Sequence, residues 1–71
     1  MPETPIAFDG VKMLATSGLG HTFLIGDREV FVGRSVSLGG TTVGIVGQVG
    51  RLVLPRWFVE QEHIDGGVVV H

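Results

Sequence analysis

The chain of 71 residues contains no cysteine, no tyrosine and a single lysine, Lys12. The absence of cysteine excludes disulfide bonds and cysteine-ligated zinc, which commonly stabilise domains of this size. A chain this short forms one domain whose core alone supplies only a small stability. Oligomerisation is the remaining stabiliser, so the sequence predicts a homo-oligomer.

Charged residues are also scarce, at 17% of the chain against about 25% in ordinary domains. Hydrophobic residues reach 44% and the mean hydropathy is +0.43, although a small domain has proportionately more surface to cover with polar groups. This excess predicts that copies of the chain, or another protein, cover part of the surface. The alternative is a lone, poorly soluble domain. The net charge of -2 disfavours nonspecific nucleic-acid binding, which depends on Lys and Arg at phosphates.

No apolar run is long enough to form a membrane-spanning helix. The longest charge-free stretch, Ser35 to Gly50, is interrupted by five glycines and by Ser, Thr and Gln, whereas a spanning helix needs about 20 mainly apolar residues. The first residues show no basic segment followed by an apolar one, so no secretory signal is expected. We therefore expect a cytoplasmic protein, or a component of a virion or other assembly, without a membrane span.

Turn signals divide the chain into short strands. Residues 1–5 contain Pro2 and Pro5 and are predicted to form a flexible arm before a single domain at 6–71. Asp9-Gly10 lies between two apolar runs. It predicts a hairpin with a type I′ turn, which needs positive φ at both central residues.

The clearest hairpin signal is Gly26-Asp27, where glycine in the first turn position suits a type II′ turn. Its register pairs Ile25 with Arg28, and side chains directly across the ladder then share a face. The predicted core face carries Phe23, Ile25, Val30 and Val32. Leu24 and Phe31 lie on the opposite face, which is a second indication of an interface.

The rest of the chain predicts further strands, with turns at Gly39-Gly40 and Gly66-Gly67. The expected segments are Ser35–Leu38, Thr41–Val46, Arg51–Leu54 ended by Pro55, Trp57–Val59 as a strand or helical turn, and Val68–Val70. We predict an all-β small barrel of about five to seven short antiparallel strands, with at most one short helical turn. From Val30 to Ile64 the order of strands and turns resembles SH3-like and Sm-like barrels.

The segment Gly44-Ile-Val-Gly-Gln-Val-Gly50 resembles the glycine fingerprint of dinucleotide-binding folds, where the backbone approaches a pyrophosphate at a helix N-terminus. No helix-forming stretch follows, because Arg51–Leu54 is a predicted strand, and the chain is too short for both halves of that fold. The glycines are interpreted as bends in strands. No cofactor is predicted.

A second candidate is the polar group near the C-terminus, which consists of Glu60, Glu62, His63, Asp65 and His71. Carboxylates and imidazoles can bind a divalent metal or act as acid and base. Glu60 and Glu62 would point one way on a strand and His63 the other, and no matching His or Cys pair lies elsewhere. A solvated polar rim is the favoured interpretation. The sequence therefore predicts no metal site and no enzyme.

The third candidate is the group Arg51, Arg56, Trp57 and Phe58. Arg and Trp are enriched in protein interface hot spots, and arginine beside aromatics can also contact phosphates and stack bases. In a third interpretation, Trp57 and Phe58 only cap the core. The acidic net charge and the single lysine favour a protein partner.

The sequence thus predicts a structural or adaptor module that self-associates and docks on another protein. The predicted interaction residues are Leu24, Phe31, Arg51, Arg56, Trp57, Phe58, Val68, Val69 and Val70. The alternative is a small nucleic-acid-binding barrel that uses Arg34, Arg51, Arg56 and Trp57. An enzyme would require an active site shared between subunits.

Overall fold

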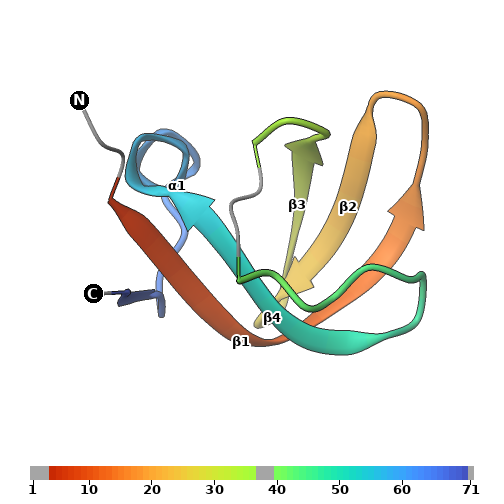
Figure 1. Ribbon diagram of the computed structural model, residues 1–71, viewed down its shortest axis with the longest axis horizontal. Coiled ribbons are helices and arrows are strands. Elements are labelled where there is room, and N and C mark those ends of the chain that lie inside the picture. The colour runs from red at the N-terminus through yellow and green to blue at the C-terminus, as the bar shows by residue number, and fades with distance from the viewer. Residues whose placement is uncertain (1–3, 37–39, 71) are drawn as a thin grey trace.

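The computed structural model describes residues 4–36 and 40–70. These residues form one antiparallel five-stranded sheet and a single short helix (Figure 1). The elements are β1 (Pro5–Thr16), β2 (Gly20–Ile25), β3 (Arg28–Gly33), β4 (Val49–Pro55), α1 (Arg56–Glu62) and β5 (Val68–Val69). The prediction of a small all-β fold of barrel-like class is confirmed. In the described part of the chain, no helix has the length and apolar character needed to cross a membrane.

Strand β1 is the centre of the sheet, whose order is β3-β2-β1-β4. Ile6 and Ala7 pair with β4 on one edge and with β5 on the other. Further along, Lys12 pairs with β4 at Val49 and with β2 at Leu24. Strands β5 and β2 therefore lie along the same edge of β1, at opposite ends of it. Strands β3 and β4 are the two outer strands of the order β3-β2-β1-β4. Figure 1 shows that β1 and β4 are both strongly bent.

The predicted hairpin at Asp9-Gly10 is wrong, because β1 runs through this dipeptide without reversing. Gly10 has φ +67, but Asp9 does not have positive φ, and a type I′ turn requires both. The β1–β4 register shifts between Phe8 and Val11, so the dipeptide forms a β-bulge. The Asp9 carboxylate accepts a hydrogen bond from Arg51 of β4 at 3.1 Å, which ties the bulge to its partner strand.

The hairpin at Gly26-Asp27 is confirmed in its residues and its register. Ile25 pairs with Arg28, and the ladder continues to Gly20 and Gly33. Gly26 has φ +66 and Asp27 does not have positive φ, which suits a type II′ turn. The predicted core residues of both strands are buried. They are Phe23, Ile25, Val30 and Val32.

The predicted strand Thr41–Val46 does not form. Instead, residues 41–43 lie beside β4 and use side chains where a strand would use backbone groups. Val53 N–H donates to Thr41 Oγ1 at 3.0 Å and Arg51 N–H donates to Thr42 Oγ1 at 2.9 Å. Threonine hydroxyls offer the backbone this alternative to a ladder. Ser35 and Val36 form a turn and not the predicted strand Ser35–Leu38. The rest of that segment, and Gly39 of the expected Gly39-Gly40 turn, lie outside the described residues.

The remaining predicted segments take the following form. Arg51–Leu54 is a strand, extended to Val49–Pro55, and Val68–Val69 is the short strand β5. Trp57–Val59 belongs to α1, whose seven residues make about two turns, more than the single turn expected. β1 begins at Pro5, and Thr4 O accepts a hydrogen bond from Arg56 N. The start of β1 and the start of α1 are therefore adjacent.

One hydrophobic core lies on the inner face of the curled sheet. Phe58 of α1 and Ile64 beyond it close this core. A helix as short as α1 depends on such packing, because two turns are marginal in isolation. The core residues are Ile6, Phe8, Val11, Met13, Phe23, Ile25, Val30, Val32, Val43, Leu52, Leu54, Phe58 and Ile64.

We expect Gly26→Val to lower the free energy of unfolding by about 1–3 kcal/mol, because a β-branched side chain is strained at positive φ. Gly44→Ala is the matched control, since Gly44 has ordinary φ and open space around a Cβ. It should change stability by less than about 0.5 kcal/mol. Urea denaturation measures both, and equal midpoints for the two variants would contradict the turn assignment.

Candidate interaction surface

The outer face of the sheet, opposite the core, carries apolar side chains together with the charged Lys12 and Glu29. Lys12 pairs with both Leu24 and Val49, so these three side chains share a face. Val49 is 60% exposed and Leu24 is half-buried. The pairing of Thr22 with Phe31 places Phe31 on the same face, and Phe31 is 52% exposed. The prediction that Leu24 and Phe31 face away from the core is confirmed.

Phe31 also has a structural contact on this face. A Cβ on Gly20 would lie 3.0 Å from Cζ of Phe31, so the ring covers the glycine of the neighbouring strand. Aromatic side chains stabilise sheet glycines in this way. One part of the ring thus packs within the chain, and the rest is exposed.

The loop before β4 adds two exposed apolar side chains, Ile45 and Val46. Gly47 N donates to Met13 O and Met13 N donates to Gln48 O, which holds the loop against β1. Ile45 lies in the segment that was predicted as a strand, and Val49 is not among the predicted interaction residues. Within 41–46, Val43 is buried whereas Ile45 is 68% exposed. No local sequence signal predicts that Ile45 is exposed and Val43 buried, because the position of the loop is set by its hydrogen bonds to β1.

The C-terminal valines lie at the other end of β1. Val68 is 67% exposed, and Val69 and Val70 are exposed as well. β5 pairs with β1 of its own chain, and Val70 N donates to Pro5 O at 2.9 Å. One edge of β5 is therefore occupied within the subunit. A Cβ at Gly67 would overlap Ile6 and Phe8, so glycine is what allows this close approach.

Trp57 and Phe58 have different environments. Phe58 is 7% exposed and belongs to the core, whereas Trp57 is 48% exposed. The two rings meet edge to face, with centroids 5.8 Å apart. Phe58 therefore caps the core, while Trp57 presents a large part of its indole at the surface.

The arginines proposed for nucleic-acid binding are not brought together. Arg51 pairs with Asp9 at 3.1 Å and Arg56 pairs with Glu60 at 2.8 Å. Arg34 donates to Gly18 O beyond the end of β1, whereas Arg56 lies at its start. Exposed ion pairs of this kind contribute little stability, about 0–1 kcal/mol. The two ion pairs nevertheless partly neutralise Arg51 and Arg56, which are two of the three arginines that would contact a phosphate backbone.

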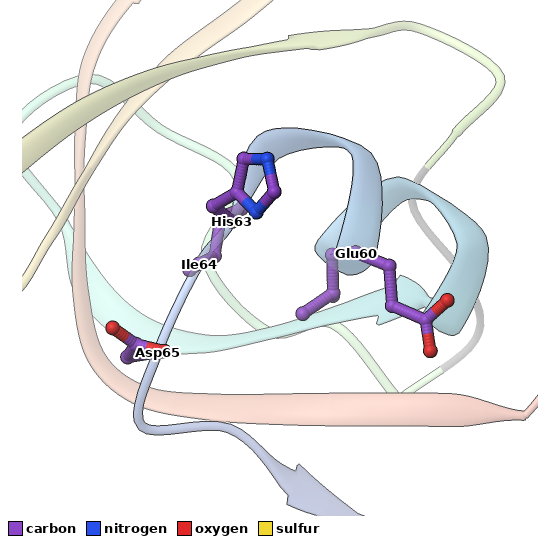
Figure 2. Close-up of a pocket in the computed structure, with 5 residues that line it drawn as sticks. Glu60, His63, Ile64 and Asp65 are labelled. Atoms are coloured by element: carbon purple, nitrogen blue, oxygen red, sulfur yellow. The ribbon is translucent and has the colours of Figure 1, made fainter.

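Three residues of the polar group near the C-terminus, Glu60, His63 and Asp65, line a shallow depression together with Val59 and Ile64 (Figure 2). The carboxylates of Glu60 and Asp65 point away from one another in Figure 2. Within 4–36 and 40–70, no three His, Cys, Asp or Glu side chains are placed to hold a metal ion. His71 lies outside the described residues.

His63 has a structural position at the end of α1. It is the C-cap residue with φ 54, and its carbonyl accepts a hydrogen bond from Arg28 Nη1 at 2.8 Å. Ile64 N donates back to Val59 O, which ends the helix and directs Ile64 into the core. The backbone of His63 therefore links α1 to the β2–β3 hairpin.

Comparison with protein-family models, with curated proteins and with solved structures gives no match for the chain. The candidate surface therefore rests on the geometry described above.

We expect His63→Gly to preserve the fold and raise its stability by about 0.5–1 kcal/mol, because glycine adopts the left-handed C-cap conformation without strain. Gln61→Gly, at an exposed helical position, should lower stability by up to about 1 kcal/mol. Thermal melting of both variants checks the pair. A large loss of stability for His63→Gly would show that the imidazole, and not the backbone, holds this corner.

Proposed function

We propose that the chain is a non-enzymatic structural or adaptor module that self-associates and docks on another protein. The observation that carries the proposal is the number of large apolar side chains left outside the core, among them Val49, Leu24 and Phe31 on the outer face and Ile45 and Val46 in the loop before β4. Two charged side chains, Lys12 and Glu29, lie among those of the outer face. Exposed aromatic and aliphatic side chains with a rim of charges are typical of interfaces.

Association would remove these exposed apolar side chains from water. Burial of a Val, Leu or Phe side chain contributes about 1.5–3 kcal/mol. Several such residues repeated by symmetry suffice to offset the entropy lost on association, which costs about 4–15 kcal/mol. Exposed Trp57 and the exposed valines of β5 are further apolar side chains at the opposite end of β1, and the same association can bury them.

A protein partner is favoured over nucleic acid because Arg51 and Arg56 are each paired with a carboxylate. A nucleic-acid surface needs free cations that follow the phosphate backbone, together with aromatic rings that stack bases. Arg34 lies beyond the end of β1, where it contacts Gly18 O, whereas Arg56 and Trp57 lie near the start of β1. These residues therefore do not form one continuous surface.

Size-exclusion chromatography with light scattering tests the proposal, at two salt concentrations and with or without added RNA. We expect an oligomer that persists at the higher salt and does not bind RNA. We expect Val69→Lys to lower the subunit number or make melting more dependent on protein concentration. Gln61→Lys introduces the same side chain on the exposed face of α1 and is the matched control.

A monomer at tens of micromolar, with no concentration dependence of melting, would contradict self-association. A complex with RNA that dissociates as salt rises would instead favour the nucleic-acid alternative.

A further inference from the structure

Two aspartates of the chain, Asp9 and Asp65, are followed directly by glycine. An Asp-Gly bond can isomerise, because the glycine backbone nitrogen can attack the carboxyl carbon of the aspartate side chain. Glycine has no side chain to obstruct the ring that forms, and its backbone reaches conformations closed to other residues. The chain contains no asparagine, so the related deamidation of Asn does not compete. The two Asp-Gly pairs have opposite environments in the fold.

Asp9-Gly10 is held in place by the pairing of β1 with β4. The residues on either side of the dipeptide, Phe8 and Val11, both pair with β4, so the bulge is fixed at both ends. Asp9 Oδ1 also accepts a hydrogen bond from Arg51 Nε at 3.1 Å. Ring formation at this pair therefore requires local opening of β1, the strand that pairs with three others.

Asp65-Gly66 lies in the connection between α1 and β5, outside every helix and strand (Figure 2). Both residues are exposed, and Gly66 has φ +91. Within 4–36 and 40–70, neither the Asp65 carboxylate nor the Gly66 N–H has a hydrogen-bond partner. The fold therefore restrains neither of the two groups that would react.

We propose that Asp65-Gly66 is a site of spontaneous isomerisation in the folded protein, with water as the only co-reactant. Gly66 N forms a bond to Asp65 Cγ, and one oxygen of the protonated carboxyl group leaves as water with the carboxyl proton and the amide proton. Water then adds to the main-chain carbonyl of the resulting succinimide ring and breaks the bond between Asp65 C and Gly66 N. The product is isoaspartate, which has a free α-carboxylate and the same mass as aspartate.

The main chain of isoaspartate passes through Cβ and Cγ, so it is one atom longer than that of aspartate. The additional atom lies between Ile64, which is anchored in the core, and Gly67. Gly67 lies so close to β1 that a Cβ there would overlap Ile6 and Phe8. This close approach leaves little room to absorb a longer connection, so the segment after Gly67 must move.

That segment is β5, which few contacts hold against β1. It has two residues, Val68 and Val69, and both are exposed. The hydrogen bond from Val70 N to Pro5 O, at 2.9 Å, continues the pairing. Isomerisation at Asp65 therefore releases β5 from β1. The modification does not depend on the proposed self-association.

Peptide mapping of the whole chain tests the site, with Asp9-Gly10 as a matched control in the same molecule. The folded protein is kept at physiological temperature and neutral pH over weeks and then digested with trypsin, which separates Asp9 in residues 1–12 from Asp65 in residues 57–71. Reversed-phase chromatography resolves peptides of equal mass that contain aspartate or isoaspartate. Isomerisation should be at least about tenfold faster at Asp65, because Asp9 reacts only when β1 opens.

The same incubation in urea shows what the fold contributes. Both pairs should then isomerise at similar rates, because each aspartate is followed by glycine and neither is held by structure. Equal rates at Asp9 and Asp65 in the folded protein, or no isoaspartate at Asp65 after an incubation that modifies the unfolded chain, would overturn the proposal.

Amide hydrogen exchange at Val70 tests the release of β5. The Val70 N–H should be protected in the fresh protein and lose its protection as isoaspartate accumulates. Asp65→Glu is the control, because it keeps the carboxylate but would have to close a larger ring, which forms far more slowly. Its Val70 N–H should stay protected through the same incubation. Full protection of Val70 in the isomerised wild-type chain would contradict the release of β5.

Discussion

The pairing of β1 with three other strands is the constraint on which the rest of the structure depends. Its 12 residues contact β4 along one edge, and β5 and β2 along the other. A straight strand of that length would leave the sheet flat, and a small flat sheet cannot enclose a core. The bulge at Gly10 and the irregularity between Met13 and Ala15 bend β1, so that the inner face closes with help from Phe58 and Ile64.

The same constraint decides which apolar groups remain outside. Because β1 has strands on both edges, the unprotected backbone lies on the outer strands of the path. Thr41 and Thr42 cover β4, which leaves β3 as the longer open edge. The apolar excess that the composition indicates is divided between a complete core and exposed side chains, and these exposed side chains are the physical basis of the proposed self-association.

Local sequence signals predicted the structure correctly where the turn residues alone determine the path of the backbone. Gly26-Asp27 predicted its hairpin and both of its faces, including Leu24 and Phe31. Asp9-Gly10 carries a similar signal, yet it forms a bulge, because a glycine at positive φ serves either purpose and only the distant pairing with β4 decides between them. Thr41–Val46 has the composition of a strand. However, the hydroxyls of Thr41 and Thr42 accept hydrogen bonds from β4 N–H groups that the carbonyls of a paired strand would accept. The exposed Val49 could not be predicted, since its face follows from a register set across β1. The resemblance to SH3-like and Sm-like barrels remains a prediction.

The central claim is that the exposed apolar side chains of Phe31 and Val49 become covered when copies of the chain associate. Nuclear magnetic resonance measures this directly, one residue at a time, as protein concentration is raised through the association range. The signals of Phe31 and Val49 should shift on association, while those of Val30 and Val32 in the core stay unchanged. Unchanged signals of Phe31 and Val49 in a sample that is fully oligomeric would contradict the account.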